Sequence, residues 1–326
     1  MILVISHDDD DHARGVIAVL RDLGADARLF DVASFPQQAS LALRYGDLEG
    51  CDLTLEDAQG RLDLRAVDTV WWRRPQPLEL DPRVPPAEVQ FTYTECAEAI
   101  TGLWTTLEAF WVNDPGRDRA AAHKAHQLRV ADDAGLRIPR TLITNDPHRA
   151  RAFVDELAPA PTVYKCFSAT PEHWRETRVL RADELALLVR VAIAPVIFQE
   201  YVPAEVDVRV TIVGDACFPA AITAAADAYP VDFRIDLDRT HIEPTELPGD
   251  VEARLRDLLA RLGLVYGAID LRRTPDGEHV FLEVNPAGQW RFVERQTGQP
   301  ITEAVARTLA AGRPAAPRPA TVLGSS

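Results

Sequence analysis

The sequence predicts an α/β fold organised as two or three packed units, and three observations support this. First, the 326 residues are enough for more than one hydrophobic core. Second, the composition, 47% hydrophobic and 26% charged, is that of a globular protein. Third, the chain opens with a buried strand at 2–6, a helical stripe at 11–23 that Gly24 ends, and a second strand at 27–32. This is a βαβ-type opening.

Composition also excludes several classes of function. The net charge of −15 argues against non-specific binding to nucleic acid, although an acidic substrate can still meet a local basic cleft. No apolar run approaches the roughly 18 residues of a membrane helix. The opening strand has neither the basic segment nor the cleavage site of a signal peptide. The four cysteines are scattered, so neither zinc nor disulfides are indicated and a reducing cytoplasm is expected.

The first unit is expected to contain short strands followed by one amphipathic helix. The strands are predicted at 40–44, 53–56, 61–64 and 67–72, and the helix at 85–110. This unit carries no GxGxxG and no Walker loop, so it has no phosphate-cradling motif. Trp104, Leu107 and Trp111 are expected in its core.

Two polar groups of the first unit allow more than one interpretation. The segment His7–His12 holds four consecutive aspartates and resembles a metal cluster, but acidic residues at a helix N-terminus are the preferred interpretation. Arg73 and Arg74 end a strand, where α/β sheets bind ligands. They either contact an anion or form a solvated pair, and the sequence leaves both open.

The central part of the chain is expected to begin with a helix and to carry two lysines. Asn113, Asp114 and Pro115 form a start signal for a helix that contains Lys124 and ends near Gly135. Further elements are predicted as a strand at 138–143, a helix at 147–157, a strand at 162–167, a mobile loop or hairpin at 168–178 and a buried strand at 195–202. Lys165 lies within the strand at 162–167, where an ammonium is costly unless it meets an anion.

The last third of the chain repeats strand patterns of period two. Along Val206–Val213 the alternation places Asp207 and Arg209 on one face of a strand. The elements that follow are predicted as a strand at 216–223, an active-site loop at 226–247, a helix at 251–262 with Gly263 as its end, a helix at 300–311 and a disordered tail at 313–326.

The segment 266–290 predicts a metal site. On a strand from His279 to Asn285, Glu283 and Asn285 point to one face, while Val280, Leu282 and Val284 point to the other. A turn sequence at 274–277 joins this strand to one at 266–272, and the resulting hairpin could bring Asp270 beside Glu283 and Asn285. Hard oxygen ligands of this kind suit Mg²⁺. An ordinary polar strand face is the alternative.

Over 113–312 the sequence resembles the ATP-grasp superfamily. The resemblance rests on the order of these residues along the chain: Lys124, Lys165, the segment 199–202, Asp207 with Arg209, Asp270, and Glu283 with Asn285. The resemblance implies an α+β ATP-grasp fold with an N-terminal pre-ATP-grasp domain at 1–113, a central subdomain at 114–202, a C-terminal subdomain at 203–312 and the tail at 313–326. It also implies ATP and Mg²⁺ as cofactors, with an acyl phosphate formed from a carboxylate. Because cationic groups and Mg²⁺ offset the charge of the transferred phosphoryl group, no covalent enzyme nucleophile is required.

The resemblance assigns roles to individual residues. Lys124 and Lys165 match the lysines that hold the nucleotide phosphates. Gln199, Glu200, Tyr201 and Val202 match the adenine hinge, and Asp207 matches the ribose ligand. Asp270, Glu283 and Asn285 match the Mg²⁺ ligands. Arg209 and Arg234 match cations that steady the acyl phosphate, with a looser pattern around Arg234.

A narrower resemblance, over nearly the whole chain, is to the graspetide (microviridin-type) synthetases, particularly those of actinobacteria. It rests on Asp31–Pro36, Val70–Pro75, Val112–Pro115 and Phe281–Trp290. It implies macrocyclisation of a ribosomal precursor peptide through ω-ester or ω-amide bonds, a leader peptide bound by the central unit, and a homodimer. The loop 168–180 is either a peptide contact or an ATP lid, and the absence of glycine after Lys165 departs from the usual phosphate cover.

Two other functions remain open at this stage. One is an ATP-grasp ligase that adds glutamate or another amino acid to a different substrate. The other is a nucleotide-binding regulatory protein without catalysis, which the complete set of Asp270, Glu283 and Asn285 disfavours.

Overall fold

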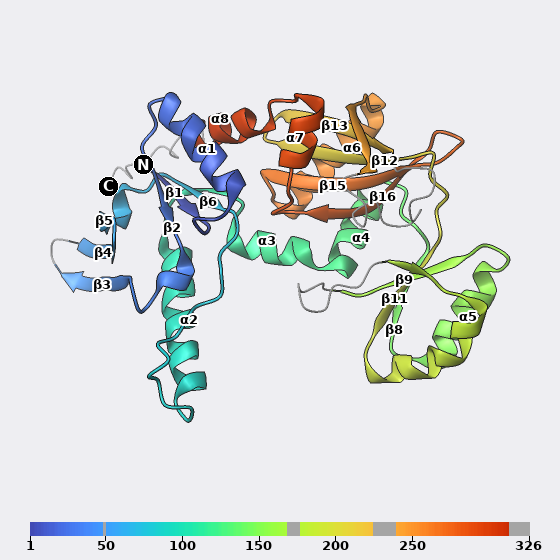
Figure 1. Ribbon diagram of the computed structural model, residues 1–326, viewed down its shortest axis with the longest axis horizontal. Helices are drawn as coiled ribbons and strands as arrows, with labels where there is room; N and C mark the ends of the chain where they lie inside the picture. Colours follow the sequence, from blue (N-terminus) through green and yellow to red (C-terminus); the bar gives the residue numbers. More distant parts are fainter. Residues whose placement is uncertain (48–49, 168–176, 224–238, 313–326) are drawn as a thin grey trace, which may run out of the picture. The chain divides into compact units, whose positions relative to one another are not determined.

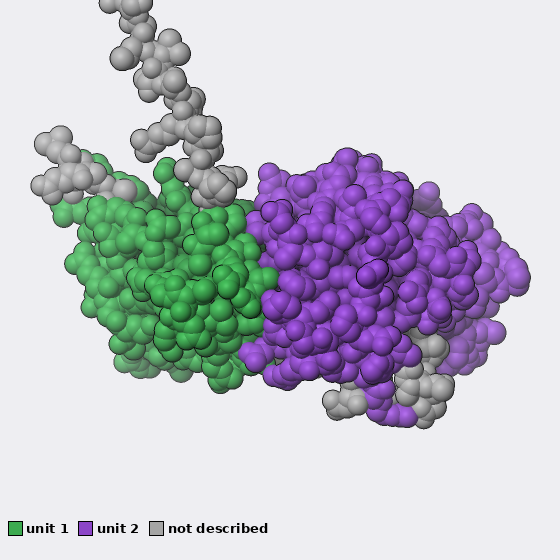
Figure 2. Space-filling view, turned by 90° about the horizontal axis from the view of Figure 1, so that it is seen from above, with its two compact units in different colours: residues 1–115, 302–326 green, residues 116–301 purple. Residues whose placement is uncertain are grey.

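The computed structural model describes residues 1–47, 50–167, 177–223 and 239–312, and the chain forms two compact units. The first comprises Met1–Pro115 with Thr302–Ser326, and the second comprises Gly116–Ile301 (Figures 1 and 2). The predicted tail at 313–326, most of the loop at 168–178 and Arg234 lie outside the described residues.

The first unit is built on a parallel four-stranded sheet with the order β2-β1-β6-β7. Its strands are β1 (Ile2–Ile5), β2 (Ala27–Phe30), β6 (Thr69–Trp72) and β7 (Phe110–Val112), and its helices are α1 (Asp11–Asp22), α2 (Val89–Thr106) and α8 (Ile301–Ala311), with 3₁₀ turns η1 (Val32–Ser34) and η2 (Leu64–Ala66). The βαβ-type opening is therefore confirmed. The helix expected at 85–110 is shorter, because prolines precede it and β7 begins at Phe110.

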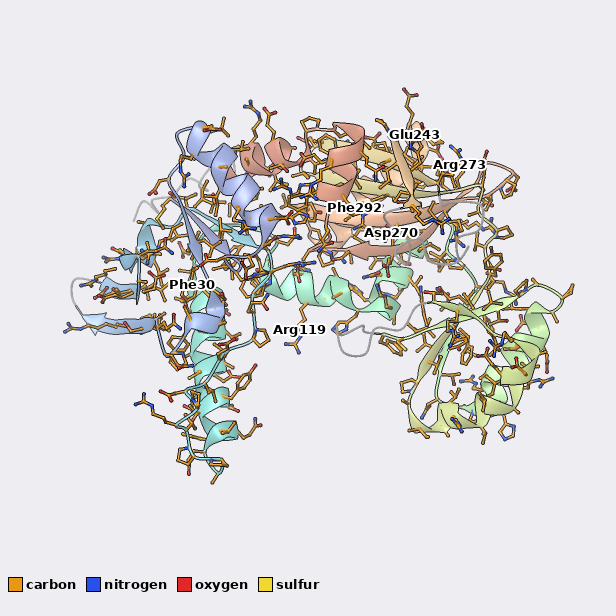
Figure 3. All side chains as sticks on the ribbon, viewed as in Figure 1. Phe30, Arg119, Glu243, Asp270, Arg273 and Phe292 are labelled. Atoms are coloured by element: carbon orange, nitrogen blue, oxygen red, sulfur yellow. The ribbon has the colours of Figure 1, made fainter. Side chains whose placement is uncertain are left out.

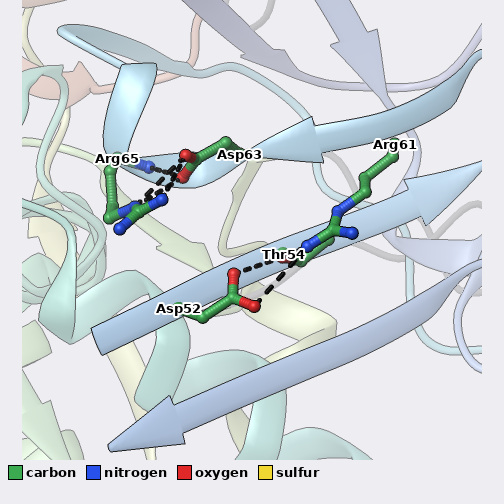
Figure 4. A network of polar contacts seen from close by, with 5 residues as sticks. All are labelled: Asp52, Thr54, Arg61, Asp63 and Arg65. Carbon is green, nitrogen blue, oxygen red and sulfur yellow. Dashed lines mark hydrogen bonds and ion pairs between the residues drawn. The ribbon is translucent and has the colours of Figure 1, made fainter. Parts of the chain in front are cut away.

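A separate antiparallel sheet in this unit contains β3 (Ser40–Asp47), β4 (Gly50–Asp57) and β5 (Gly60–Asp63). Figure 4 shows its polar side chains: Arg61 contacts Thr54 and Asp52, and Arg65 binds Asp63. Hydrogen bonds from Arg65 lower the pKa of Asp63 to about 2. The core of the unit includes Trp104 and Leu107, as predicted, whereas Trp111 packs against it only partly buried.

The polar groups of the first unit are structural. Asp10 caps α1 by accepting a hydrogen bond from the His12 amide, so acidic residues at a helix N-terminus is the correct interpretation. Arg73 is 1% exposed, and its Nε lies 3.3 Å from Asp10. Arg73 is therefore not part of a solvated pair, whereas Arg74 is partly buried, and contact of either arginine with an anion stays a prediction. Burial alone would raise the pKa of Asp10, but bonds from His12, the charge of Arg73 and a bond from Ser6 hold that pKa well below its usual range.

The second unit contains two antiparallel sheets. The smaller has the order β10-β9-β11-β8 and consists of β8 (Thr141–Thr144), β9 (Thr162–Lys165), β10 (Arg178–Val179) and β11 (Val196–Glu200). It packs with α5 (Pro147–Leu157) and the 3₁₀ segment η4 (Ala182–Ile193) through Ala150, Leu188, Val191 and Phe198. The predicted strands at 138–143, 162–167 and 195–202 and the predicted helix at 147–157 are confirmed with shifted ends, and η4 is an additional element.

The larger sheet has the order β14-β13-β12-β15-β16. Its strands are β12 (Val206–Val213), β13 (Ala216–Thr223), β14 (His241–Pro244), β15 (Tyr266–Arg273) and β16 (His279–Asn285), and its helices are α3 (Pro115–Ala122), α4 (Lys124–Asp133), α6 (Gly249–Leu262) and α7 (Arg291–Thr297). Residues of α4 and α6 share one core with β12, β15 and β16. No helix in the described part of the chain is long and apolar enough to span a bilayer.

Three predictions for this unit are wrong in detail. The helix from 115 to 135 is interrupted at His123, whose extended backbone (φ −75°, ψ 115°) makes Lys124 the first residue of α4. Part of the loop expected at 226–247 is the edge strand β14, which pairs with β13. The alternation of β16 is broken by a bulge, described below.

Candidate active site

The hairpin of β15 and β16 brings the predicted metal ligands together. Asp270 and Glu283 are direct cross-strand partners, and Asn285 lies opposite Ala268, two positions further along. The prediction that a hairpin places Asp270 beside Glu283 is therefore confirmed. Glu283 and Asp270 are both largely shielded from solvent, with side-chain exposures of 21% and 13%.

A β-bulge sets which side chains of β16 face this site. Leu271 pairs with Phe281 and Asp270 with Glu283, so Leu282 is an extra residue in the strand. Phe281 is in the core, and Leu282 is only partly buried and lines a pocket with Lys165 and Glu200. The prediction that Leu282 points away from the site is wrong, because the bulge interrupts the period of two.

Arg209 on β12 is held against Asp270 on the neighbouring strand. Its Nη1 lies 2.7 and 2.8 Å from the two carboxylate oxygens, and Nη2 donates to the Gln289 carbonyl at 3.1 Å. The guanidinium carbon also lies 6.0 Å from the ring centre of Phe292. Figure 3 labels Asp270 and Phe292 on the ribbon. Although burial lowers it, the pKa of Arg209 is raised overall by the charge and hydrogen bonds of Asp270. Arg209 is thus a fixed cation at the centre of the sheet face.

Lys124 meets the metal-ligand pair from the helix side. Its Nζ donates to Glu283 Oε2 at 2.6 Å, and the ammonium and the carboxylate are both about four-fifths buried. The break at His123 places Lys124 in the first turn of α4, so this contact comes from a helix end and not from the middle of a helix.

The donor set fits Mg²⁺. Two carboxylates on paired strands and the adjacent Asn285 amide supply hard oxygen atoms, which is the ligand type that Mg²⁺ takes from proteins. Asn285 Oδ1 already accepts a hydrogen bond from the Ala287 amide, which fixes the orientation of that side chain and leaves an oxygen lone pair. Arg209 and Lys124 offset the negative charge of these carboxylates in the structure described here.

A pocket next to this site collects the predicted hinge residues and the second lysine. It is lined by Pro139, Val163, Lys165, Thr177, Gln199, Glu200, Tyr201, Val202, Arg272 and Leu282. The side chain of Gln199 is 3% exposed and donates to Thr141 on β8, so this residue offers the pocket mainly its backbone. Glu200 lies at the end of β11, and its Oε1 is 3.9 Å from Arg137 Nη2.

Arg272 is a site residue that the sequence interpretation missed. It is 5% exposed, and its Nε and Nη2 lie 2.8 and 3.3 Å from the two oxygens of Asp207. Its Nη1 donates to the Val202 carbonyl at 3.0 Å, and its guanidinium lies over the Tyr201 ring. The signal was available, because Arg272 is two residues from Asp270 and therefore shares its face. Arg272 joins the hinge segment to the predicted ribose ligand.

The segment after Asn285 is fixed by close packing. Tyr266 donates its hydroxyl hydrogen to the Gly288 carbonyl at 2.8 Å, and its ring packs on the fully buried Trp290. A Cβ at position 288 would lie 2.4 Å from the Cβ of Ala268 and 3.1 Å from Arg209. Glycine is therefore required here by the close approach of backbone to strand and guanidinium.

Comparison with known proteins agrees with this geometry. A family model described as the MvdD pre-ATP grasp domain matches residues 1–119, and one described as the RimK-like ATP-grasp domain matches residues 121–309. Among curated proteins, a probable alpha-L-glutamate ligase 2 of Shewanella amazonensis is 26% identical, over 72% of this chain and 78% of its own length.

Solved structures match over nearly the whole chain. Macrocyclase MdnC of Microcystis aeruginosa, bound with the precursor peptide MdnA, has a TM-score of 0.86 and 30% identity, covering 95% of this chain and 99% of its own. A Chryseobacterium gregarium RiPP-associated ATP-grasp ligase, in complex with ADP and a leader and core peptide, has a TM-score of 0.88 and 26% identity, covering 95% and 96%.

The fold and the site thus define a nucleotide-dependent ligase. The paired carboxylates lie on the larger sheet of the second unit, Lys124 contacts them from helix α4, and the pocket with Lys165 lies beside them. The chain belongs to the ATP-grasp ligases, with an MvdD-type pre-ATP-grasp domain followed by a RimK-like ATP-grasp domain.

Proposed function

We propose that this chain is a graspetide macrocyclase, an ATP-dependent ligase that joins side chains of a ribosomally made precursor peptide. The observation that carries the proposal is the extent of the similarity. The peptide macrocyclase MdnC matches 95% of the chain, including the pre-ATP-grasp domain, whereas the curated glutamate ligase matches 72%. Such an enzyme would act where precursor peptides are made, in the cytoplasm.

The proposed reaction has two steps. A carboxylate oxygen of a peptide Asp or Glu attacks the γ-phosphorus of ATP, and ADP leaves. A Ser or Thr hydroxyl, or a Lys amine, then attacks the acyl carbon, loses its proton and displaces phosphate. Each bond closed removes the elements of one water from the peptide. An ω-ester is expected on family resemblance, and an ω-amide is the alternative product.

The residues divide this work by their chemistry. Lys124 and Lys165 would bind nucleotide phosphates, and the backbone of Gln199, Glu200, Tyr201 and Val202 would contact the adenine edge, with Asp207 on the ribose. Asp270, Glu283 and Asn285 would hold Mg²⁺, which supplies charge neutralisation at the transferred phosphoryl group when bound. Arg209, and Arg234 from outside the described residues, would steady the acyl phosphate with a permanent charge.

The buried guanidinium of Arg209 supports its proposed role. Its hydrogen bonds to Asp270 and to the Gln289 carbonyl hold it in one orientation before substrate arrives. A fixed cation needs no reorganisation when charge develops in the transition state, and it acts more strongly in a site shielded from water. Lys124 would place a second positive charge at the site, because its ammonium, at the start of α4, binds the carboxylate of the proposed metal ligand Glu283.

The leader peptide is proposed to bind the smaller sheet of the second unit. The η4 segment exposes Leu187, Val189 and Ile193, with exposures of 46%, 67% and 85%. Leu188 and Val191 on the same segment are buried in the core, so the exposed side chains are not needed to pack η4 against the sheet. An amphipathic peptide helix would cover such a patch. The loop 168–180, as a peptide contact or an ATP lid, stays a prediction.

A homodimer is proposed to form through α2. The second half of this helix buries Ile100, Leu103 and Trp104, whereas the first half exposes Val89, Phe91 and Tyr93. Phe91→Glu is expected to convert a dimer to a monomer in light scattering after size exclusion. Thr101→Glu adds the same charge at an exposed position of the same helix and should leave the mass unchanged.

The decisive experiment is mass spectrometry of a precursor peptide encoded beside this chain after incubation with the protein, ATP and Mg²⁺. Loss of one water per bond, together with ADP, is expected, and Glu283→Gln should abolish both. Glu243→Gln, on the exposed edge strand β14, is the matched control. Mild alkaline hydrolysis separates ester from amide. ADP without dehydration would favour the amino-acid ligase as the second candidate, and the absence of both would refute the proposal.

A further inference from the structure

Gln127 is a buried side chain of α4 that bonds both the end of α3 and strand β16 beside the proposed metal ligands. It is 1% exposed and makes three hydrogen bonds. Its Nε2 donates to the Val284 carbonyl at 2.8 Å and to the Ala121 carbonyl at 2.6 Å, and its Oε1 accepts from the Val284 amide at 3.2 Å. Both donors and the acceptor of one amide are therefore used.

Two of these bonds replace a missing strand. β16 is the edge strand of its sheet, so the amide and carbonyl of Val284 face outward with no neighbouring strand. The Gln127 amide meets both groups as a strand residue would. Val284 lies between Glu283 and Asn285, two of the three proposed metal ligands. The edge contact is thus made at the one residue that joins them.

The third bond fixes the helix that carries Lys124. α3 ends at Ala122, so the Ala121 carbonyl is among the last carbonyls of that helix, which have no partner within it. Gln127 provides that partner. Lys124 and Gln127 are three residues apart on α4 and therefore share one face of the helix. Lys124 binds Glu283 while Gln127 binds the next residue of the same strand.

We propose that Gln127 is a positioning residue of the nucleotide and metal site, and this rests on the proposed function. It holds the broken helix α3–α4 on the edge of β16 so that the Lys124 ammonium and the Glu283 carboxylate keep one separation. Only an amide meets the requirement, because the two carbonyls need donors and the Val284 amide needs an acceptor. A carboxylate lacks the donors, an ammonium lacks the acceptor, and an apolar side chain lacks both.

The test is binding of Mg·ADP, measured by titration calorimetry on the full chain, beside the melting temperature. Gln127→Leu is expected to weaken Mg·ADP binding by about 10-fold to 100-fold, the usual effect of losing a residue that orients metal ligands. In peptide turnover the KM for ATP should rise while the KM for the peptide stays unchanged. Gln299→Leu is the control, because Gln299 also donates its amide hydrogen to a strand carbonyl, that of Pro219, away from the ligands.

A second variant separates positioning from general stability. Gln127→Glu keeps the acceptor for Val284 but loses both donors at neutral pH. Its defect in Mg·ADP binding, expressed relative to wild type, should shrink between about pH 8 and about pH 6, because the buried introduced carboxyl becomes protonated and regains a donor. Wild-type affinity for Mg·ADP in both folded variants, whatever their melting temperatures, would overturn the proposal. So would failure of both variants to fold when the control folds.

Failure of the role proposed for Gln127 can be distinguished from failure of the proposed function. Wild-type protein that binds Mg·ADP but does not dehydrate a peptide would remove the macrocyclase proposal and leave the role of Gln127 testable by the same titration.

Discussion

Arg209 and Asp270 are directly opposite each other on β12 and β15, and one guanidinium nitrogen lies within 2.8 Å of both carboxylate oxygens. The same carboxylate is a proposed Mg²⁺ ligand. We therefore propose two functions for the arginine: it orients the Asp270 carboxylate, and it adds a permanent positive charge where phosphoryl transfer is proposed.

Replacing Arg209 tests this geometry. Arg209→Lys keeps a charge but cannot contact Asp270 and the Gln289 carbonyl together. We expect kcat for peptide dehydration to fall by about 100-fold or more, as when a preorganised donor is removed from an active site. Arg273→Lys, at a partly exposed residue of β15 paired with Glu205, should retain wild-type kcat. Equal rates for the two variants would contradict the role of Arg209.

Arg272 links the hinge to Asp207, so its loss should affect nucleotide binding and stability together. Arg272→Ala leaves a largely buried Asp207 carboxylate without this ion pair, which is expected to cost about 3 kcal/mol in the free energy of unfolding. The KM for ATP should rise more than kcat falls. Denaturant titration and steady-state kinetics measure the two effects. A stability loss with an unchanged KM for ATP would assign Arg272 to folding alone.

Gly288 is predicted to tolerate no side chain. In Gly288→Ala the added methyl group would overlap the Cβ of Ala268 and press on Arg209, so both stability and kcat should fall. The control is Gly102→Ala on α2, where nothing lies within 4 Å of the added atom. That substitution should stabilise the helix by up to about 1 kcal/mol. Thermal unfolding of the two variants gives opposite shifts if the packing is as described.

Asp118 predicts a pH dependence of stability. Burial raises its pKa from 3.8 to about 6, and its Oδ2 is buried with no hydrogen-bond partner. Because the folded pKa is above the unfolded value, the folded state binds more protons between these values, and stability decreases as pH rises from 4 to 6. Asp118→Asn should remove the penalty, stabilising the protein by about 3 kcal/mol near pH 8 and by little near pH 4.

The measurement is the difference in unfolding free energy between Asp118→Asn and wild type as a function of pH. Asp155→Asn, at an exposed acidic residue of α5, is the control substitution. A constant difference across the pH range would show that the Asp118 carboxyl does not titrate as described.

The site was largely predictable because its residues lie on strands. Period-two alternation placed Asp207 with Arg209 and Glu283 with Asn285, and a turn sequence between two strands indicated the pairing of Asp270 with Glu283. The elements missed depend on tertiary contacts. Helix propensity does not predict the break at His123. At this break the Gln127 side chain, and not a helix amide, binds the Ala121 carbonyl.

The same reasoning explains the remaining errors. The short helix α7 begins directly after the buried Trp290, and no helical pattern in the sequence predicts it. The bulge at Leu282 depends on how β15 and β16 pack, which the alternation of residues in either strand does not reveal. Arg73 and Asp10 are 63 residues apart in the chain, so their ion pair could not be inferred from either segment alone. Arg234 stays a prediction, because it lies outside the described residues.

Because of the bulge in β16, the number of residues in this strand is more strictly constrained than the types of its side chains. Leu282 lines the pocket that contains Lys165 and Glu200, and Glu283, the next residue, faces Asp270. Two consecutive residues therefore lie at the proposed base pocket and at the proposed metal site. Deleting either residue would remove the bulge and leave only one of these two side chains on this face of the strand. Homologous sequences that keep this chemistry should therefore vary in residue type at 282 yet carry no insertion or deletion between 281 and 285.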